Sequence, residues 1–279
     1  MLLRHNYNDS FIEFISSEDA LFHYTKKNIV FENILYSDCF KLSTFKNSND
    51  PQEYKDPLIE AAGWGWEEST HPQIDQTQAL IEIIIRNQTC FGSFCINKFN
   101  NDQLESQGFL KSRMWSQYGE GHEGICLVFS KKIIIKTITE SINDNEFLFF
   151  KQEMKYNNSI RDGSGPLTVQ VNGDSFKKES SHTIAVDHII NHYDGLFFTK
   201  QNDYKDEKEY RIIVCKINDE NHGDFTYHFP VSNCLKGIIL GDRFHKNYRP
   251  LIEPFKQKLE LGYRQLHWES GEYTLLNQL

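Results

Sequence analysis

The chain has 279 residues, of which 39% are hydrophobic, 14% aromatic and 25% charged. This composition is typical of a globular protein with one large core or two modest ones, and it excludes a collagen-like or low-complexity chain. Lys and Arg number 30 and Asp and Glu number 39, so the net charge is 30 − 39 = −9. Such a charge disfavours unspecific binding to nucleic acid and to anionic membranes. The chain also has 21 Phe and 13 Tyr, and composition alone does not indicate what role these aromatic residues have.

The first half of the chain is predicted to alternate short strands and helices. Runs of β-branched and aromatic residues indicate strands, whereas apolar residues three and four apart indicate helices. The predicted elements are a strand at Ala20–Thr25, a helix near Lys27–Leu35, a strand at Asp38–Phe45, a helix at Asp75–Asn87 and strands at Thr89–Ile96 and Ile125–Ser130. Between the last two strands lies a short helical turn interrupted by glycines.

The second half begins with a segment at 157–174 that is rich in Gly, Asn, Asp and Ser, which predicts an irregular insertion. The elements predicted after it are a helix near His182–Tyr193 and strands near Leu196–Thr199, Glu209–Lys216 and Gly237–Leu240. No repeat or linker divides the chain, so we expect one domain over residues 1–279. Mixed elements without a regular βαβ rhythm predict an α+β fold with a largely antiparallel or mixed sheet.

The six cysteines are scattered and form no Cys-x-x-Cys pair. This pattern predicts buried, reduced thiols rather than a disulfide framework or a zinc site. The N-terminus does not read as a secretory signal, and the longest apolar stretches are far shorter than the ~20 residues of a membrane helix. We therefore expect a cytoplasmic bacterial protein with no membrane partner.

The most informative polar cluster is Glu207-Lys208-Glu209-Tyr210-Arg211, which leads into an apolar strand. Alternation along a strand places Glu207, Glu209 and Arg211 on one face, with Tyr210 on the other. Two carboxylates and a guanidinium there can bind a cation, a ribose hydroxyl or a substrate base. A solvated strand edge with weak ion pairs is the alternative.

A second cluster is the strand segment Phe22-His23-Tyr24-Thr25. His23 can form a hydrogen bond with a ligand hydroxyl, although a histidine whose hydrogen bonds are satisfied within the core is the more common situation.

At Asn49-Asp50-Pro51 the residues favour a turn and the start of a helix. Ser43, Asn49 and Asp50 are secondary candidates for contact with a ligand.

Two further clusters lie on predicted helices. Trp115 and Tyr118 stand beside a glycine-rich turn and can stack on a planar ring, although such aromatics more often belong to the core. His188 and His192 have the i, i+4 spacing of a chelating pair but lack the glutamate of a zinc protease motif. No dinucleotide-binding, P-loop or nucleophile-elbow motif is present, and no metal site is predicted.

Several motifs taken together carry a family resemblance: LFHYT, LSTFKNSNDPQEY, CFGSFC, MWSQYGEGHEGICLVFS, FFTKQNDYKDEKEYRIIV and KGIILGDRF. In this order they resemble a large bacterial family, the domain of unknown function numbered 2971, over about residues 20–244. That resemblance implies little about function.

A looser resemblance supplies a chemistry. An early strand with a histidine, a middle aromatic and a late strand-borne glutamate is similar to the His-Tyr-Glu arrangement of ADP-ribosyltransferases, whose nucleic-acid-modifying toxin branch opens with a His-x-Thr like His23-Tyr24-Thr25. The resemblance implies a split antiparallel or mixed sheet surrounded by helices, with NAD as the substrate in a cleft between two small sheets. Residues implied to contact NAD are His23, Tyr24, Thr25, Ser43, Asn49, Asp50, Trp115, Tyr118 and Arg211.

The implied catalytic residues are His23, Tyr118 and Glu209, with Glu207 competing with Glu209 for one role. The expected function is a mono-ADP-ribosyltransferase or NAD glycohydrolase that acts as a toxin or anti-phage effector. A protein or nucleic-acid acceptor and an antitoxin or defence-system partner are then expected. The alternatives are a metal-dependent nuclease that uses Glu207, Glu209 and Asp50, and a non-catalytic sensor or partner-binding module.

Overall fold

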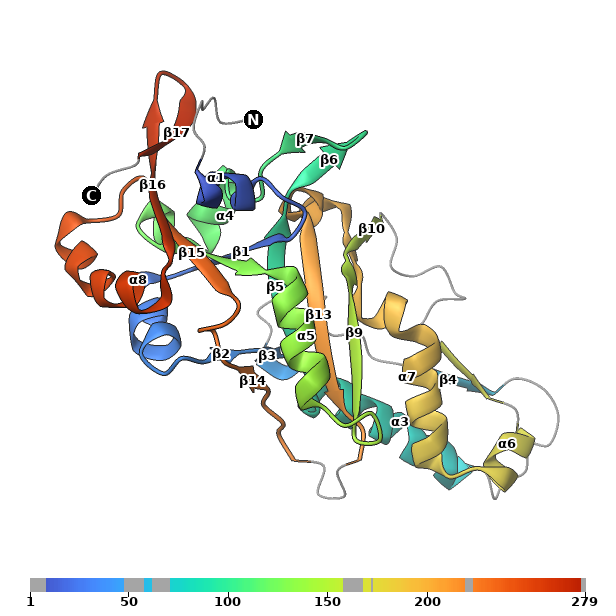
Figure 1. Ribbon diagram of the computed structural model, residues 1–279. Helices are drawn as coiled ribbons and strands as arrows, with labels where there is room; N and C mark the ends of the chain where they lie inside the picture. The colour runs from blue at the N-terminus through green and yellow to red at the C-terminus, as the bar shows by residue number, and fades with distance from the viewer. Residues whose placement is uncertain are drawn as a thin grey trace.

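The computed structural model describes residues 9–47, 58–61, 71–157, 168–171, 173–218 and 223–276. A mixed sheet of nine strands runs through the described part (Figure 1). Its order is β17 (Glu272–Leu276), β16 (Gly262–Glu269), β15 (Leu235–Leu240), β8 (Ile125–Ser130), β1 (Ala20–Thr25), β5 (Thr89–Ile96), β13 (Glu209–Lys216) and β9 (Phe147–Glu153), while β3 (Ser43–Thr44) also pairs with β5. Neighbours are antiparallel except β15 and β16, which are parallel. The predicted α+β class with a mixed sheet is thereby confirmed.

Helices cover both faces of this sheet. The α-helices are α1 (Ser10–Ile15), α2 (Lys27–Ile29), α3 (His71–Asn87), α4 (Ser112–Gln117), α5 (Lys131–Ser141), α6 (Gly173–Lys178), α7 (Ser181–Phe197) and α8 (Glu253–Leu259). The π-helical turn η1 (Val30–Leu35) continues α2, and the 3₁₀ turns are η2 (Phe45–Asn47), η4 (Glu120–His122), η5 (Asn202–Glu207) and η6 (Lys246–Leu251).

Short strand pairs complete the description. They are β2 (Phe40–Lys41) with β14 (His228–Phe229), β4 (Leu58–Ala61) with β11 (Thr168–Val171), β6 (Lys98–Asn100) with β7 (Gln103–Ser106), and β10 (Lys155–Asn157) with β12 (Thr199–Gln201). The predicted insertion at 157–174 lies largely outside the described residues, and its described part includes β11.

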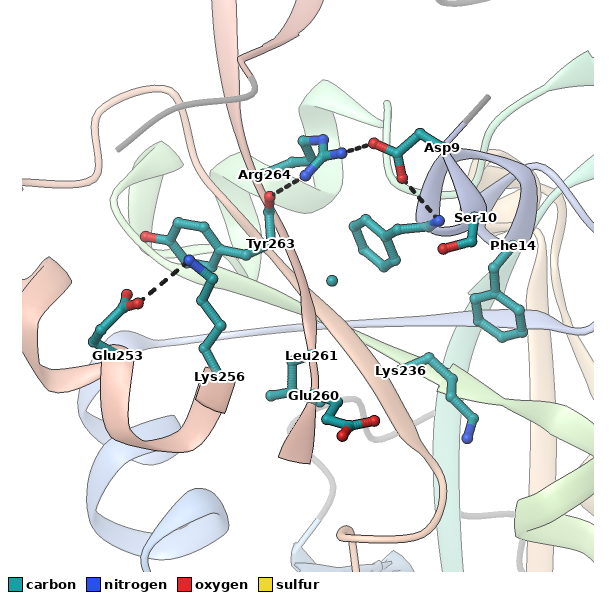
Figure 2. Close-up of a pocket in the computed structure, with 12 residues that line it drawn as sticks. Asp9, Ser10, Phe14, Lys236, Glu253, Lys256, Glu260, Leu261, Tyr263 and Arg264 are labelled. Carbon is teal, nitrogen blue, oxygen red and sulfur yellow. Dashed lines mark hydrogen bonds and ion pairs between the residues drawn. The ribbon is translucent and has the colours of Figure 1, made fainter. Parts of the chain in front are cut away.

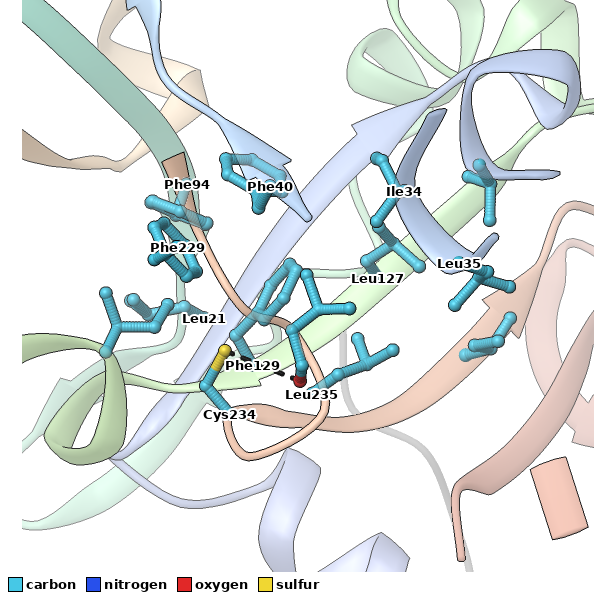
Figure 3. Close-up of a cluster of buried hydrophobic side chains, with 14 of the residues drawn as sticks. Leu21, Ile34, Leu35, Phe40, Phe94, Leu127, Phe129, Phe229, Cys234 and Leu235 are labelled. Atoms are coloured by element: carbon cyan, nitrogen blue, oxygen red, sulfur yellow. Dashed lines mark hydrogen bonds between the residues drawn. The ribbon is translucent and has the colours of Figure 1, made fainter. Parts of the chain in front are cut away.

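One face of the sheet carries the largest hydrophobic core. Alternation along β8 and β13 turns Leu127, Phe129, Ile212 and Val214 towards it, and Ile134 of α5 packs on them. Figure 3 shows part of this cluster around Phe129. Full burial of each such side chain contributes about 1.5–3 kcal/mol, so this face anchors the sheet.

The opposite face is covered by two separate clusters. Helices α3 and α7 pack over Ile213 and Cys215 at the β13 end, whereas α1 and α4 pack over Phe22 and Val128 nearer the centre. Between these clusters β5 and β13 present polar groups instead of apolar ones. The sequence thereby leaves room for a polar cavity on this face.

The sheet also opens between β1 and β5. Strand β1 pairs with β8 over all six residues, but it pairs with β5 only at Leu21↔Ile96 and Phe22↔Cys95. Beyond Phe22 the two strands separate, and the ring of His23 bridges them by a hydrogen bond to the carbonyl of Ser93. The sheet is therefore continuous in order but forked at its centre.

The strands predicted at Ala20–Thr25, Thr89–Ile96, Ile125–Ser130 and Glu209–Lys216 have the predicted bounds. A strand at Leu196–Thr199 is wrong, because α7 continues through Phe197 and buries Leu196 and Phe197 against α3. The predicted strand at Asp38–Phe45 divides into β2 and β3. Helix α5 and strands β9, β16 and β17 are not among the predicted elements.

A cavity of about 830 Å³ lies at the edge of the sheet beside α1. Phe11 of α1 lies where Gly237 and Gly262 leave space, since a Cβ on either glycine would overlap its ring. Figure 2 shows two ion pairs among the charged groups around this cavity, Asp9 with Arg264 and Glu253 with Lys256. Such pairing is typical of a structural contact.

Among the described helices, none combines the length and apolarity needed to cross a bilayer.

Candidate functional site

A second cavity, of about 540 Å³, lies at the fork of the sheet. The side chains around it come from β1, β3, β5, β12 and β13, from α4, and from the turns η2 and η5. Its lining residues are Phe22, His23, Tyr24, Ser43, Asn47, Phe91, Ser93, Phe94, Cys95, Met114, Gln117, Tyr118, Lys200, Tyr204, Glu207 and Glu209. The structure thus brings His23, Tyr24, Ser43, Tyr118, Glu207 and Glu209, six of the predicted site residues, into one cavity.

Glu209 is the most tightly held group in this cavity, with 3% of its surface exposed. Its Oε1 accepts hydrogen bonds from Ser93 Oγ at 2.6 Å and Arg211 Nε at 2.7 Å. Its Oε2 accepts from Lys200 Nζ at 2.7 Å and from an Arg211 terminal nitrogen at 3.3 Å. Burial alone would raise the pKa of Glu209, but the Arg211 and Lys200 cations outweigh it and hold that pKa well below its usual range. Glu209 is therefore ionised, and its lone pairs are already used by the protein.

Lys200 connects the two carboxylates. Its Nζ lies 3.1 Å from Glu207 Oε2 and 2.7 Å from Glu209 Oε2, and the side chain is 12% exposed. The ammonium also lies over the ring of Tyr204, 5.3 Å from its centroid. One lysine thereby neutralises part of the charge of both glutamates and fixes their separation.

Glu207 is as buried as Glu209 but less well satisfied. Only Oε2 is bonded, to Lys200, while Oε1 is buried and has no hydrogen-bond partner among the described residues. Burial raises the pKa of Glu207, with the charge of Glu209 adding to this and Lys200 opposing it. A buried acceptor without a donor costs free energy, so Oε1 is suited to a hydroxyl or N–H of a bound molecule.

A bend in the backbone separates the two glutamates. Lys208 has the left-handed conformation, with φ 47° and ψ 56°, at the junction of η5 and β13. Glu207 is consequently not part of the strand, contrary to the alternation predicted for it, whereas Glu209 and Arg211 share a strand face as predicted. The bend lets both carboxylates reach Lys200.

His23 occupies the fork itself. Because a carbonyl can only accept, Nδ1 donates its hydrogen to Ser93 O at 3.1 Å, and Nε2 of the neutral ring is left as an acceptor. Burial lowers the pKa of His23, which the hydrogen bond to Ser93 partly offsets. The ring packs edge-on against Phe40. A neutral His23 can accept a hydrogen bond from a hydroxyl or amide in the cavity.

The two candidate aromatics have different surroundings. Tyr118 lies at the cavity with 46% of its surface exposed, and partial burial raises its pKa to about 12. Trp115 is fully buried, donates its indole N–H to Phe109 O at 2.8 Å, and packs edge-on against Tyr24. Trp115 is thus part of the core and does not line the cavity, so of the two only Tyr118 can stack on a ligand there.

Other predicted residues lie outside the cavity. Arg211 is 1% exposed and is bonded to Glu209 and the carbonyl of Phe197, so its guanidinium is not available to a phosphate. Thr25 is buried at the end of β1 and is not in the cavity lining. Asn49 and Asp50 are outside the described residues.

His188 and His192 lie side by side on α7, with ring centroids 4.5 Å apart and the ring planes tilted by 36°. In the part of the chain that the structure describes, no group of three His, Cys, Asp or Glu side chains is arranged to hold a metal ion. All six cysteines are free thiols, and all but Cys39 are buried, in agreement with the sequence prediction. Burial raises the pKa of Cys215 to about 12.

Sequence reasoning missed Lys200, Ser93, Tyr204 and Tyr156. Tyr156 accepts a hydrogen bond from the backbone N–H of Glu209 at 3.0 Å, which fixes the start of β13. Three of the four lie within motifs already noted, Lys200 and Tyr204 in FFTKQNDYKDEKEYRIIV and Ser93 in CFGSFC. A polar residue between aromatics on a buried strand was the available signal for Ser93.

A neighbouring cavity of about 600 Å³ shares His23, Ser43, Phe91 and Ser93 with the cavity at the fork. His23 therefore has access to space on both sides of the fork. A long ligand has room to extend along β5.

Fold and site together define an α+β protein with a forked mixed sheet and a cavity at the fork that contains two buried carboxylates. A family model described as "Protein of unknown function (DUF2971)" matches residues 114–212. This match supports the family resemblance seen in the sequence motifs, and it spans Tyr118, Lys200, Glu207 and Glu209 but not His23. No curated protein and no solved structure shows significant similarity to the chain.

Proposed function

We propose that the chain is an NAD-consuming enzyme, a mono-ADP-ribosyltransferase or NAD glycohydrolase with an ADP-ribosyltransferase-like fold. The observation that carries the proposal is the unpartnered Oε1 of Glu207 in the same cavity as His23 and Tyr118. The fork between β1 and β5 supports the fold assignment, because a sheet divided at its centre is what the ADP-ribosyltransferase resemblance implies. The cavity, of about 540 Å³, is in the size range of small-molecule sites.

The reaction breaks the bond between the nicotinamide nitrogen and C1′ of its ribose. Both electrons of that bond go to the ring nitrogen, nicotinamide leaves as a neutral molecule, and positive charge remains on the ribose. The nucleophile of the acceptor, or water, then bonds to C1′ and loses a proton. A fixed carboxylate beside C1′ stabilises the charge as it develops, which lowers the barrier.

The cavity supplies a group for each requirement of this step. Glu207 Oε1 accepts a hydrogen bond from a ribose hydroxyl and lies close to the developing charge. His23 Nε2 accepts from a second hydroxyl or from the carboxamide, and the Tyr118 ring stacks on nicotinamide. Glu209 positions Lys200 and Arg211 and does not contact the substrate. This assignment separates the two glutamates that the sequence alone left in competition.

The biological role within this proposal is that of a bacterial toxin or anti-phage effector. The acceptor is a protein, a nucleic acid or water, and an antitoxin or defence-system partner would restrain the activity in the host cell. A sensor without catalysis is the outcome if the site binds NAD and never releases nicotinamide.

The test is to incubate the protein with NAD and measure free nicotinamide by chromatography, with and without cell extract. Glu207→Gln is expected to reduce release by at least about 100-fold, since losing one group that stabilises transition-state charge costs about 10²–10³ in rate. Glu123→Gln, a substitution on the exposed partner of Lys27, is the matched control and should retain full release. Equal release of nicotinamide by wild type and Glu207→Gln, or no release by wild type with any acceptor, would contradict the proposal.

A further inference from the structure

A fourth cavity, of about 330 Å³, adjoins the proposed NAD site. It shares Met114 and Glu207 with that site and is otherwise lined by the segment leading into α4 and by the end of η5. Its lining residues are Ser106, Gln107, Leu110, Lys111, Ser112, Arg113, Met114, Asp206 and Glu207. Glu207 is therefore common to both cavities.

Two cations face this cavity without a carboxylate partner. Lys111 Nζ donates to the carbonyl of Asp206 at 2.9 Å, and an Arg113 terminal nitrogen donates to the carbonyl of Asp203 at 2.7 Å. Arg113 Nε donates to the side-chain amide of Gln117 at 3.3 Å. In the described part of the chain neither cation forms an ion pair, although Asp206 and Glu207 line the same cavity.

The protein has a net charge of −9, and several of its other cations are paired with carboxylates. Lys27, Lys98 and Arg264 each form an ion pair with a carboxylate. Lys111 has three donor hydrogens and Arg113 has five, and only some of them are used. Both side chains are half-buried, and Arg113 is held in place over the ring of Tyr204, 5.6 Å from its centroid. Pre-positioned cations with unused donors next to a cavity are suited to an anionic group.

We infer that Lys111 and Arg113 form a diphosphate-binding subsite for the substrate of the Glu207 site. The inference rests on the proposed function, because in NAD the nicotinamide ribose is joined directly to a diphosphate. A ribose held at Glu207 places that diphosphate one sugar away, and the cavity of Lys111 and Arg113 is the adjoining space. Arg211, the guanidinium expected to meet the pyrophosphate, is buried against Glu209 and cannot do so.

The subsite is tested with probes that separate phosphate binding from catalysis. Binding of inorganic pyrophosphate and of ADP-ribose is measured by calorimetry for wild type, Lys111→Gln and Arg113→Gln. Each variant is expected to weaken both ligands at least 10-fold, and Arg113→Lys should weaken them less. Lys98→Gln and Arg243→Gln remove cations elsewhere, at an exposed ion pair and an exposed position, and should leave binding unchanged.

Kinetics give a second readout that a loss of folding would not mimic. Lys111→Gln and Arg113→Gln should raise KM for NAD while leaving the cleavage of nicotinamide riboside, which has no phosphate, at the wild-type rate. Wild-type affinity for ADP-ribose in both variants would overturn the inference even if nicotinamide is released. Conversely, loss of pyrophosphate binding in the variants together with no nicotinamide release by wild type would retain the subsite and overturn the proposed function.

Discussion

At the scale of single residues, Glu207 and Glu209 are both buried but differ in their hydrogen bonds. Glu209 accepts four hydrogen bonds from three side chains, whereas Glu207 accepts one, from Lys200. A carboxylate with all its lone pairs used stabilises the fold, and one with a free oxygen can bind a ligand. The difference is not visible in the sequence Glu-Lys-Glu, where the two residues look equivalent.

Glu209→Gln is therefore expected to destabilise the protein rather than only to inactivate it. The substitution leaves the buried guanidinium of Arg211 without its carboxylate, and breaking a buried ion pair in this way costs about 3–5 kcal/mol. Urea unfolding followed by circular dichroism measures the free energy of unfolding. Glu207→Gln is the control and should unfold close to wild type, because its amide oxygen can still accept from Lys200, whose charge stays paired with Glu209. Equal stability of the two variants would contradict the division of roles.

Trp115 shows why part of the site could not be predicted from the sequence. Trp115 and Tyr118 both stand beside the glycine-rich turn, and helical spacing does not say which ring points inwards. In the structure the backbone and ring of Trp115 occupy the space beside Gly119, where a Cβ would lie 2.7 Å from the indole. The glycine four residues after the tryptophan was the only local sign that this ring is enclosed.

At the scale of elements, the strands with dense β-branched and aromatic sequences were predicted to the residue. The end of α7 was not, since Leu196-Phe197-Phe198-Thr199 fits a strand by composition and only packing on α3 extends the helix. That error displaced β12 by three residues and hid Lys200, which the strand carries to Glu207 and Glu209. Contacts between elements decide where a helix ends and the next strand begins, and these contacts cannot be predicted from a single sequence.

The bend at Lys208 is an element boundary with a testable role. A non-glycine residue in the left-handed conformation costs about 1–2 kcal/mol, and here its carbonyl also accepts from the N–H of Ile96 at 3.0 Å. Lys208→Gly removes that strain but increases the entropy of the unfolded chain. The free energy of unfolding should therefore stay within about 1 kcal/mol of wild type, and nicotinamide release should stay close to the wild-type rate.

Lys208→Pro fixes φ near −65° and cannot form the bend. It should abolish nicotinamide release, because Glu207 no longer reaches Lys200. Lys208→Ala keeps the conformation at a cost similar to that of lysine and serves as the control in the same assay. Full activity in the proline variant would show that the bend does not position Glu207.

At the scale of the whole molecule, the cavity exists because the sheet is covered unevenly. One face has a single large core, while the other has two cores with polar strand residues between them. The fork of β1 and β5 lies over that gap, so His23 reaches the same space as the glutamates from the adjacent strands. The alternation of side chains along β13 correctly placed Glu209 and Arg211 on one face, but the sequence could not show that β1 and β5 separate after Phe22.

The buried His23 at the centre of the sheet links global stability to pH. Its pKa is lowered in the folded protein, mainly by burial, from an ordinary value of 6.5. Below that value the unfolded chain binds a proton that the folded protein does not. The contribution of His23 to the free energy of unfolding is therefore complete above about pH 6.5 and decreases as the pH falls below it. The contribution of one such group reaches at most about 1.4 kcal/mol per pH unit.

The measurement is the free energy of unfolding in urea at pH 7.5 and 5.5 for wild type and His23→Asn, whose amide can donate to Ser93 O but does not titrate. His122, whose pKa burial also lowers, and Glu207, whose raised pKa acts in the opposite direction, are present in both proteins. They cancel in the comparison. Wild type should lose more stability than His23→Asn between the two pH values, and an equal loss would mean that His23 protonates as readily in the folded protein as in the unfolded chain.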